Sequence, residues 1–108
     1  MAPVTLTQAD NGKSVEIEPG GTVTIRLGEN PTTGYRWAVD TAIPDVVTLV
    51  SSDYAPAQNA GVGSGGERAF IFKATKAGMA PIHLKLWRDW EGDKSITQRF
   101  DVTIHVRG

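Results

Sequence analysis

The sequence predicts an all-β protein, an immunoglobulin-like antiparallel β-sandwich of about seven to eight strands. Apolar and polar residues alternate along most of the 108-residue chain, and no apolar stripe of helical period is present. Stretches with turn chemistry, such as "EPGG" and "KAG", separate the alternating runs. Short strands at regular spacing are typical of two-layer sandwiches, although the Cys…Trp…Cys pattern of antibody domains is absent.

Taken in order, the alternating runs place eight strands in one domain that spans residues 1–108. The expected strands cover residues 3–8, 13–18, 22–28, 35–41, 46–53, 67–75, 80–87 and 97–106. In the third run, Val23, Ile25 and Leu27 alternate with polar residues, and residues 100–106 repeat the pattern. Because strand side chains alternate between faces, each apolar set is expected to face a core between two sheets.

The connections between these strands differ in length. Successive strands of such a sandwich usually run in opposite directions, so every second connection lies at the same end. One end is then expected to carry residues 9–12, 29–34, 54–66 and 88–96, and the other end residues 19–21, 42–45 and 76–79. All connections at the second end are short. Long loops gathered at one end of a rigid sandwich favour a role in recognition.

Composition excludes several classes of function. The chain has no cysteine, so a disulfide, a cysteine nucleophile and a cysteine zinc site are impossible. Eleven basic and twelve acidic residues give a net charge of -1 and no basic stripe for nucleic acid. No stretch approaches the roughly 20 apolar residues that span a membrane. The N-terminus lacks signal-peptide features, which fits either a cytoplasmic protein or a mature periplasmic or secreted form, and a monomer is expected.

Catalytic and metal sites are not expected. His83 and His105 both fall on the polar phase of strands, and no serine lies in a nucleophile elbow. Asp89, Glu91 and Asp93 alternate as in a calcium loop, but the rest of that loop is missing. The sequence therefore indicates a protein without a cofactor that acts by binding.

Three motifs lie in the long connections. The first is "NPTTGY", formed by Asn30, Pro31, Thr32, Thr33, Gly34 and Tyr35. The second is "GVGSGG", formed by Gly61, Val62, Gly63, Ser64, Gly65 and Gly66. The third is "RDW", formed by Arg88, Asp89 and Trp90. We call them the first, second and third loops.

Each loop has a plain and a functional interpretation. A turn at Asn30-Pro31 needs no threonines after it, while Tyr35 and Trp37 are expected to return to the core. The second loop has no G-K-[ST] and no following helix, so it is either a flexible connector or a backbone that approaches another surface closely. Leu86 is expected to point inward and Trp87 outward. Trp90 either anchors an interface or folds back on the core.

Together the three loops resemble those of the chagasin-type inhibitors of papain-like cysteine proteases. That family carries an N-P-T-T-G-[YF] loop, a G-x-G-G loop and an R-P-[WF] loop in this order. Here Gly63, Ser64, Gly65 and Gly66 match the second motif, while Asp89 stands where the third usually has proline.

The resemblance implies that the three loops form a wedge in the cleft of a papain- or cathepsin-type protease. Residues 63–66 would lie over the catalytic cysteine, and Thr32 and Thr33 would contact the flank near the catalytic histidine. Arg88 and Trp90 would pack on the other flank. Two alternatives remain: an immunoglobulin-like adhesion or ligand-binding module that uses the same loops on a glycan or a protein partner, and a small structural domain of a larger surface protein.

Overall fold

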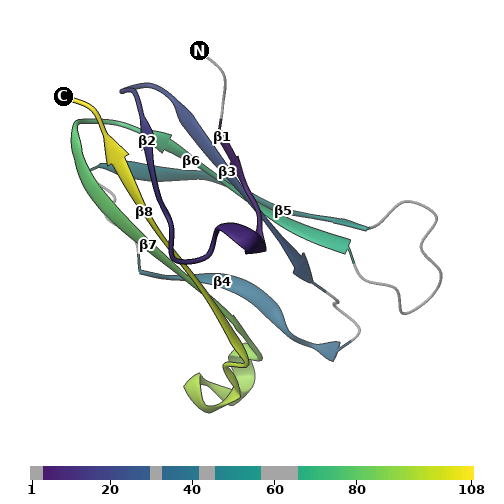
Figure 1. The fold of residues 1–108 in the computed structure, drawn as a ribbon. Helices are drawn as coiled ribbons and strands as arrows, with labels where there is room; N and C mark the ends of the chain where they lie inside the picture. The colour runs from purple at the N-terminus through teal and green to yellow at the C-terminus, as the bar shows by residue number, and fades with distance from the viewer. Residues whose placement is uncertain (1–3, 30–32, 42–45, 57–65) are drawn as a thin grey trace.

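The computed structural model describes residues 4–29, 33–41, 46–56 and 66–108, and its strands form two facing layers (Figure 1). The first sheet has the order β1 (Val4–Leu6), β3 (Thr22–Glu29), β6 (Gly66–Ala74) and β5 (Val47–Pro56). The second has the order β2 (Ser14–Ile17), β8 (Gln98–Val106), β7 (Gly78–Trp87) and β4 (Arg36–Thr41). The predicted eight-stranded β-sandwich is confirmed. No helix in the described part of the chain is long and apolar enough to cross a membrane.

The pairing of the strands is mixed. Four pairs are antiparallel, as predicted, but β1 pairs with β3 in parallel and β2 pairs with β8 in parallel. A short helix, η1 (Gln8–Asp10), separates β1 from β2 and carries the chain from one sheet to the other. The two strands therefore cannot form a hairpin, and each joins the edge of a different sheet.

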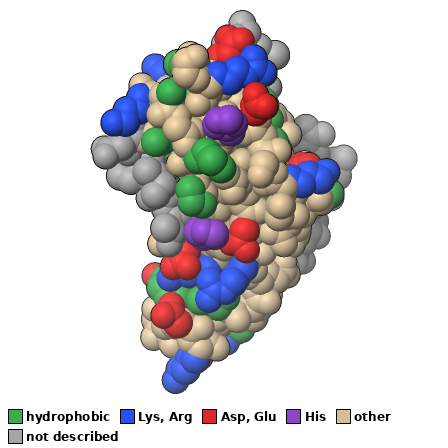
Figure 2. Space-filling view, turned by 60° about the vertical axis from the view of Figure 1, so that its left-hand side comes forward, with side chains coloured by type: hydrophobic (Ala, Val, Ile, Leu, Met, Phe, Trp, Pro, Cys, Tyr) green, Lys and Arg blue, Asp and Glu red, His purple; other side chains and the backbone are tan. Residues whose placement is uncertain are grey.

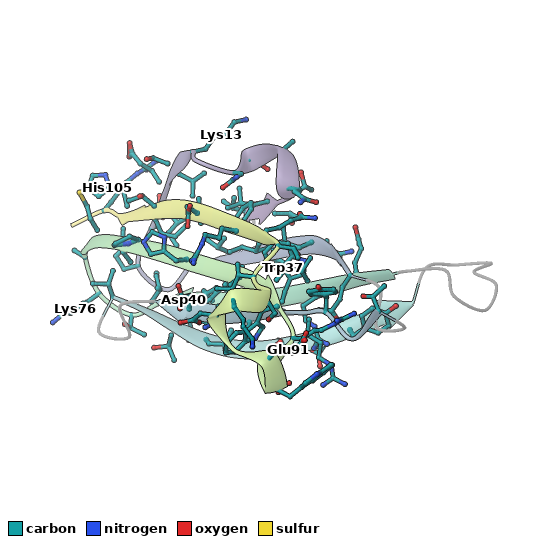
Figure 3. All side chains as sticks on the ribbon, turned by 90° about the horizontal axis from the view of Figure 1, so that it is seen from below. Lys13, Trp37, Asp40, Lys76, Glu91 and His105 are labelled. Carbon is teal, nitrogen blue, oxygen red and sulfur yellow. The ribbon has the colours of Figure 1, made fainter. Side chains whose placement is uncertain are left out.

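The core fills the space between the sheets with the residues that the alternation selects. Every second residue is buried along β3, where Val23, Ile25 and Leu27 have no exposed surface, and along residues 70–74 of β6, 80–84 of β7 and 100–106 of β8. Trp37 is also buried, and Figure 3 shows its side chain between the layers. Burial of these side chains, each worth about 1.5–3 kcal/mol, is the main force that holds the sheets together.

Several predicted strand boundaries differ from the observed ones, and two of the differences have identifiable reasons. The first strand, expected at residues 3–8, ends at Leu6 because η1 begins at Gln8. There the Asp10 carboxylate accepts the N–H of Thr7 at 2.9 Å, which together with Lys13 lowers the pKa of Asp10. The fifth strand continues past residue 53 to Pro56, since it stays paired with β6 up to Gly66.

The strand registers bring the ends of the three loops together. Gly66 pairs with both Glu29 and Pro56, so the described ends of the first and second loops are neighbours in one sheet. In the second sheet Arg36 pairs with Trp87, which joins the return of the first loop to the start of the third. We call this the loop end of the sandwich, and the opposite end, with residues 18–22 and 74–78, the turn end (Figure 1).

The connection at residues 9–12 lies on the side of the loop end, as predicted from the strand directions, but it stops short of the three loops. Gly12 donates its N–H to the carbonyl of Asp101 at 2.6 Å, and the Asn11 side chain accepts the N–H of Asp101 at 2.8 Å. Asp101 lies three residues inside β8, which begins at Gln98. Because β1 is only three residues long, the chain turns back before it reaches the loops.

The outer face of the second sheet is of mixed charge and also carries apolar side chains, among them Met79, which is 64% exposed. Both histidines, His83 on β7 and His105 on β8, are at least partly exposed on this face (Figure 2), as their polar phase predicts. The ring of His83 lies 2.6 Å from the Asp101 carboxylate on the neighbouring strand. Acidic and basic side chains are interspersed on the face shown, without a stripe of one sign (Figure 2).

Candidate functional site

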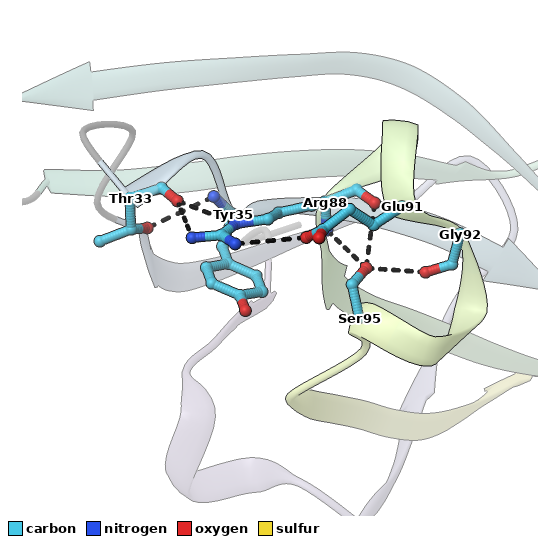
Figure 4. A network of polar contacts seen from close by, with 6 residues as sticks. All are labelled: Thr33, Tyr35, Arg88, Glu91, Gly92 and Ser95. Carbon is cyan, nitrogen blue, oxygen red and sulfur yellow. Dashed lines mark hydrogen bonds and ion pairs between the residues drawn. The ribbon is translucent and has the colours of Figure 1, made fainter.

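Arg88 joins the first and third loops directly. Its guanidinium donates two hydrogen bonds to the carbonyl oxygen of Thr33, from Nε at 3.2 Å and from Nη2 at 3.0 Å (Figure 4). The two residues are 55 positions apart in the sequence. A planar guanidinium can hold one acceptor from two nitrogens, which fixes both distance and direction. The described parts of the two loops therefore form one connected surface.

The same guanidinium is held on two further sides. Its central carbon lies 4.4 Å from the centre of the Tyr35 ring, and its Nη1 lies 3.2 Å from the Glu91 carboxylate. Glu91 belongs to the short helix η3 (Asp89–Glu91). Tyr35 is half-buried beneath the arginine, so the prediction that it returns to the core is wrong, whereas the same prediction for Trp37 is confirmed. The tyrosine ring instead orients Arg88 by a cation–π contact.

Ser95 fixes the backbone of the third loop from below. Its hydroxyl accepts the N–H of Arg88 at 2.9 Å and lies 2.7 Å from the carbonyl oxygen of Gly92 (Figure 4). Ser95 ends the short helix η4 (Asp93–Ser95) and is buried. The hydroxyl closes the segment from Arg88 to Ser95 into a compact unit, a role that sequence reasoning missed.

Trp90 projects from the third loop and lies against the first. Its side chain is 69% exposed, which excludes the interpretation that it folds back on the core. The Cη2 atom of its ring lies 2.7 Å from the place where a Cβ on Gly34 would be. Gly34 has φ +82°, a conformation that L side chains rarely adopt. Glycine at this position therefore permits both the positive φ angle in the first loop and the packing of the Trp90 indole against it.

Lys85 attaches the third loop to the second sheet. Its ammonium group lies 3.4 Å from the Asp40 carboxylate on β4, 3.5 Å from that of Asp93 on η4, and 3.5 Å from the centre of the Trp87 ring. Two acidic residues after the third loop therefore pair with different cations: Asp93 pairs with Lys85, and Glu91 pairs with Arg88. In the view of Figure 3, Asp40 lies between Glu91 and Lys76, and Lys76 belongs to the turn end.

A hollow of about 400 Å³ lies under the loops, between the ends of the two sheets. Backbone and side chains from both sheets line it. The lining residues are Gly28, Glu29, Thr33, Tyr35, Gly66, Leu86 and Gln98. Leu86, an apolar lining residue, packs partly against the core, as predicted.

The predicted site residues divide into two groups. Thr33, Gly34, Tyr35, Arg88, Asp89 and Trp90 are all at the loop end, and direct contacts join five of them. The others, Asn30, Pro31, Thr32, Gly61, Val62, Gly63, Ser64 and Gly65, lie outside the described residues. Gly66 was expected in the second loop but is the first residue of β6, because it pairs with Glu29 and Pro56.

The fold and the loop end define a β-sandwich protein that presents clustered loops for binding to a partner. A model of the chagasin family of peptidase inhibitors, I42, matches residues 16–104, and the chain belongs to this family. That match covers seven of the eight strands in part or in full.

Curated relatives and solved structures agree with this assignment. The chain is 30% identical to chagasin of Trypanosoma cruzi over 103 residues, covering 92% of this chain and 94% of chagasin. It is 31% identical to amoebiasin-1 of Entamoeba histolytica over 105 residues, covering 92% and 99%. The cysteine protease inhibitor EhICP2 of Entamoeba histolytica superposes with a TM-score of 0.86 at 25% identity, covering 96% and 95%.

Family membership decides between the interpretations of the sequence. The chain is an inhibitor of cysteine proteases and not an enzyme. The predicted resemblance to chagasin-type inhibitors is confirmed, and the inhibitor interpretation is supported over that of an adhesion or glycan-binding module.

Proposed function

We propose that the three loops, residues 30–35, 61–66 and 88–90, occlude the active-site cleft of papain-family cysteine proteases by tight, reversible, non-covalent binding. The second loop would lie over the catalytic cysteine, and the first and third loops would contact the two flanks. The protein would act as a single domain and as a monomer. A standard interface of about 800 Å² per partner would be sufficient.

The observation that supports this proposal most is the pair of hydrogen bonds from Arg88 to the carbonyl of Thr33. They exist in the free protein, so Thr33 of the first loop and Arg88 of the third are already held together before a protease arrives. Binding then costs less conformational entropy than it would for two independent loops. The exposed Trp90 beside Arg88 has the composition of an interface hot spot.

Occupation of the cleft explains inhibition without cleavage. Glycines leave no Cβ atoms to hold the two main chains apart, so the second loop could lie low across the nucleophile. A backbone whose carbonyl carbon is outside attack geometry, or whose carbonyl oxygen is outside the oxyanion hole, gives the thiolate no route to an acyl-enzyme. The protease would be blocked while the inhibitor remains intact.

Titration of papain with the purified protein tests the proposal. We expect activity to fall in proportion to added inhibitor and to reach zero near one equivalent, with trypsin unaffected as a control. Mass spectrometry after prolonged incubation should find the inhibitor uncut. Full papain activity at micromolar inhibitor, or steady cleavage of the second loop, would contradict the proposal.

A further inference from the structure

We infer that Glu29 and Arg68 form a positioning pair that sets the spacing between the first and second loops and thereby the affinity for the protease. This inference rests on the function proposed above. Glu29 is the last residue of β3 and directly precedes the first loop. Arg68 is the third residue of β6 and follows the second loop by two positions.

The Glu29 carboxylate joins three strands at the loop end. One oxygen, Oε1, accepts the backbone N–H of Trp37 at 2.7 Å and the Nε–H of Arg68 at 3.3 Å. The other, Oε2, accepts an Nη2–H of Arg68 at 2.9 Å. Trp37 lies on β4, beyond the first loop, so a single side chain bonds both sheets and both sides of that loop.

Arg68 extends the connection to the second loop. It stands opposite Tyr54 on β5, and its guanidinium lies 5.8 Å from the centre of the tyrosine ring. Two pairs further on, Pro56 stands opposite Gly66, where the described ends of the second loop meet. Arg68, on β6, therefore contacts β5 through Tyr54, and these two strands flank the second loop. Its charge is paired with the Glu29 carboxylate, which lies next to the first loop.

The burial of this pair distinguishes it from the other ion pairs of the described residues. The Glu29 side chain has no exposed surface, and that of Arg68 is 18% exposed. The carboxylate side chains of the other described ion pairs are 24% to 84% exposed. Burial of a charge pair adds little net stability, and apolar residues of similar volume often serve as well. What apolar residues cannot supply is the bidentate geometry that holds Glu29, next to the first loop, and Arg68, next to the second, at one distance.

Three variants separate positioning from stability. Glu29→Gln keeps an acceptor for the N–H of Trp37 but leaves the Arg68 charge unpaired, so we expect lower thermal stability and weaker inhibition. Adding Arg68→Met to it removes the unpaired charge, so stability should recover while the bond between the loops stays absent. Val106→Ala is the control, because it opens a cavity at a buried position near the turn end.

Dissociation constants for papain and unfolding temperatures are measured for all variants. We expect the dissociation constant to rise about tenfold in Glu29→Gln and in the double variant, mainly through faster dissociation. In Val106→Ala it should stay within about twofold of wild type despite a lowered unfolding temperature. If Glu29→Gln does not fold, Arg68→Lys, which keeps the charge but loses the fork, should fold and show the same weakening.

Two results would overturn the inference. One is a dissociation constant that follows unfolding temperature through the whole series, including Val106→Ala. The other is wild-type affinity in a folded Glu29→Gln or Arg68→Lys variant. Failure of the wild-type protein to inhibit papain would instead reject the proposed function. In that case hydrogen exchange of residues 30–36 and 57–66, faster in Glu29→Gln than in Val106→Ala, still tests the positioning without a protease.

Discussion

The two ends of the sandwich differ in the hydrogen bonds that join distant segments. At the turn end backbone groups make the main connections: Gly20 donates to the carbonyl of Ala74 at 3.0 Å, and Thr75 donates to that of Val46 at 2.8 Å, with a second bond from the Thr75 hydroxyl to the same carbonyl at 3.2 Å. At the loop end side chains make the connections, with Glu29 and Arg88 each bonding segments far apart in the sequence. Side chains can be removed singly whereas backbone groups cannot. Single side-chain substitutions should therefore alter the structure of the loop end more than that of the turn end.

The largest effect is expected from Arg88→Ala. It removes both hydrogen bonds to Thr33, the cation–π contact with Tyr35 and the ion pair with Glu91. We expect the inhibition constant for papain to rise about thirtyfold or more, since a hot-spot arginine contributes about 2 kcal/mol or more and each 1.4 kcal/mol is a factor of ten.

Arg107→Ala is the matched control for that variant. Arg107 forms ion pairs with Glu16 and Glu18 near the turn end, and its side chain is 56% exposed. Exposed pairs contribute little, so its inhibition constant should stay within about twofold of wild type. Equal losses in the two variants, measured by enzyme titration and surface plasmon resonance, would show that the two ends do not differ.

Two glycines with nearly the same backbone conformation, one at each end, test the difference between the loop end and the turn end. Gly34 at the loop end has φ +82°, and Gly20 at the turn end has φ +84°. A Cβ on Gly20 would meet nothing within 4 Å, whereas one on Gly34 would lie 2.7 Å from the Trp90 ring. Alanine at either position should lower the free energy of unfolding by about 1–2 kcal/mol. Only Gly34→Ala also displaces the indole.

Unfolding in urea and inhibition of papain together separate strain from displacement. We expect similar losses of stability in Gly20→Ala and Gly34→Ala, but an inhibition constant raised about tenfold in Gly34→Ala alone. Indole fluorescence offers a second readout, since Trp90 would lose its contact with the first loop. Equal inhibition by the two variants would mean that the position of the Trp90 side chain does not affect binding.

The sequence predicts those features of the fold that depend on residues close together in the chain. The alternation of Val23, Ile25 and Leu27 is a period of two, and it correctly predicts both the strand and its buried face. The parallel pairing of β1 with β3 and of β2 with β8 was not predicted, because alternation identifies the inward face of a strand but not its neighbour.

The contacts that organise the site were missed because they join distant residues. Glu29 and Arg68 are 39 positions apart, and Arg88 and Thr33 are 55 apart. One signal was present in the sequence: Glu29 continues the inward phase of Leu27, and Arg68 continues that of Phe70. Opposite charges in the inward phase of two strands predict a buried pair. Ser95 gives no such signal, since its role depends on the path of its own loop.

The smallest effect is expected at Asp89, where the family motif has proline. Asp89 is the first residue of η3, and the preceding Arg88 is extended, with φ -101° and ψ 111°. Proline fits the first position of a helix, where the N–H has no partner within the helix, and it favours an extended residue before it. Nothing in this backbone opposes proline, and Ser95 already fixes the segment that proline would stiffen.

Asp89→Pro should therefore raise the free energy of unfolding by about 0.4–1 kcal/mol through a less flexible unfolded chain. For papain-like proteases we expect a severalfold gain in affinity, or a changed order of preference among them, because a charge leaves the tip of the third loop. Asp89→Ala is the control, since it removes the charge without fixing φ. Unchanged inhibition constants for several proteases in both variants would show that neither the charge nor the rigidity of residue 89 affects binding.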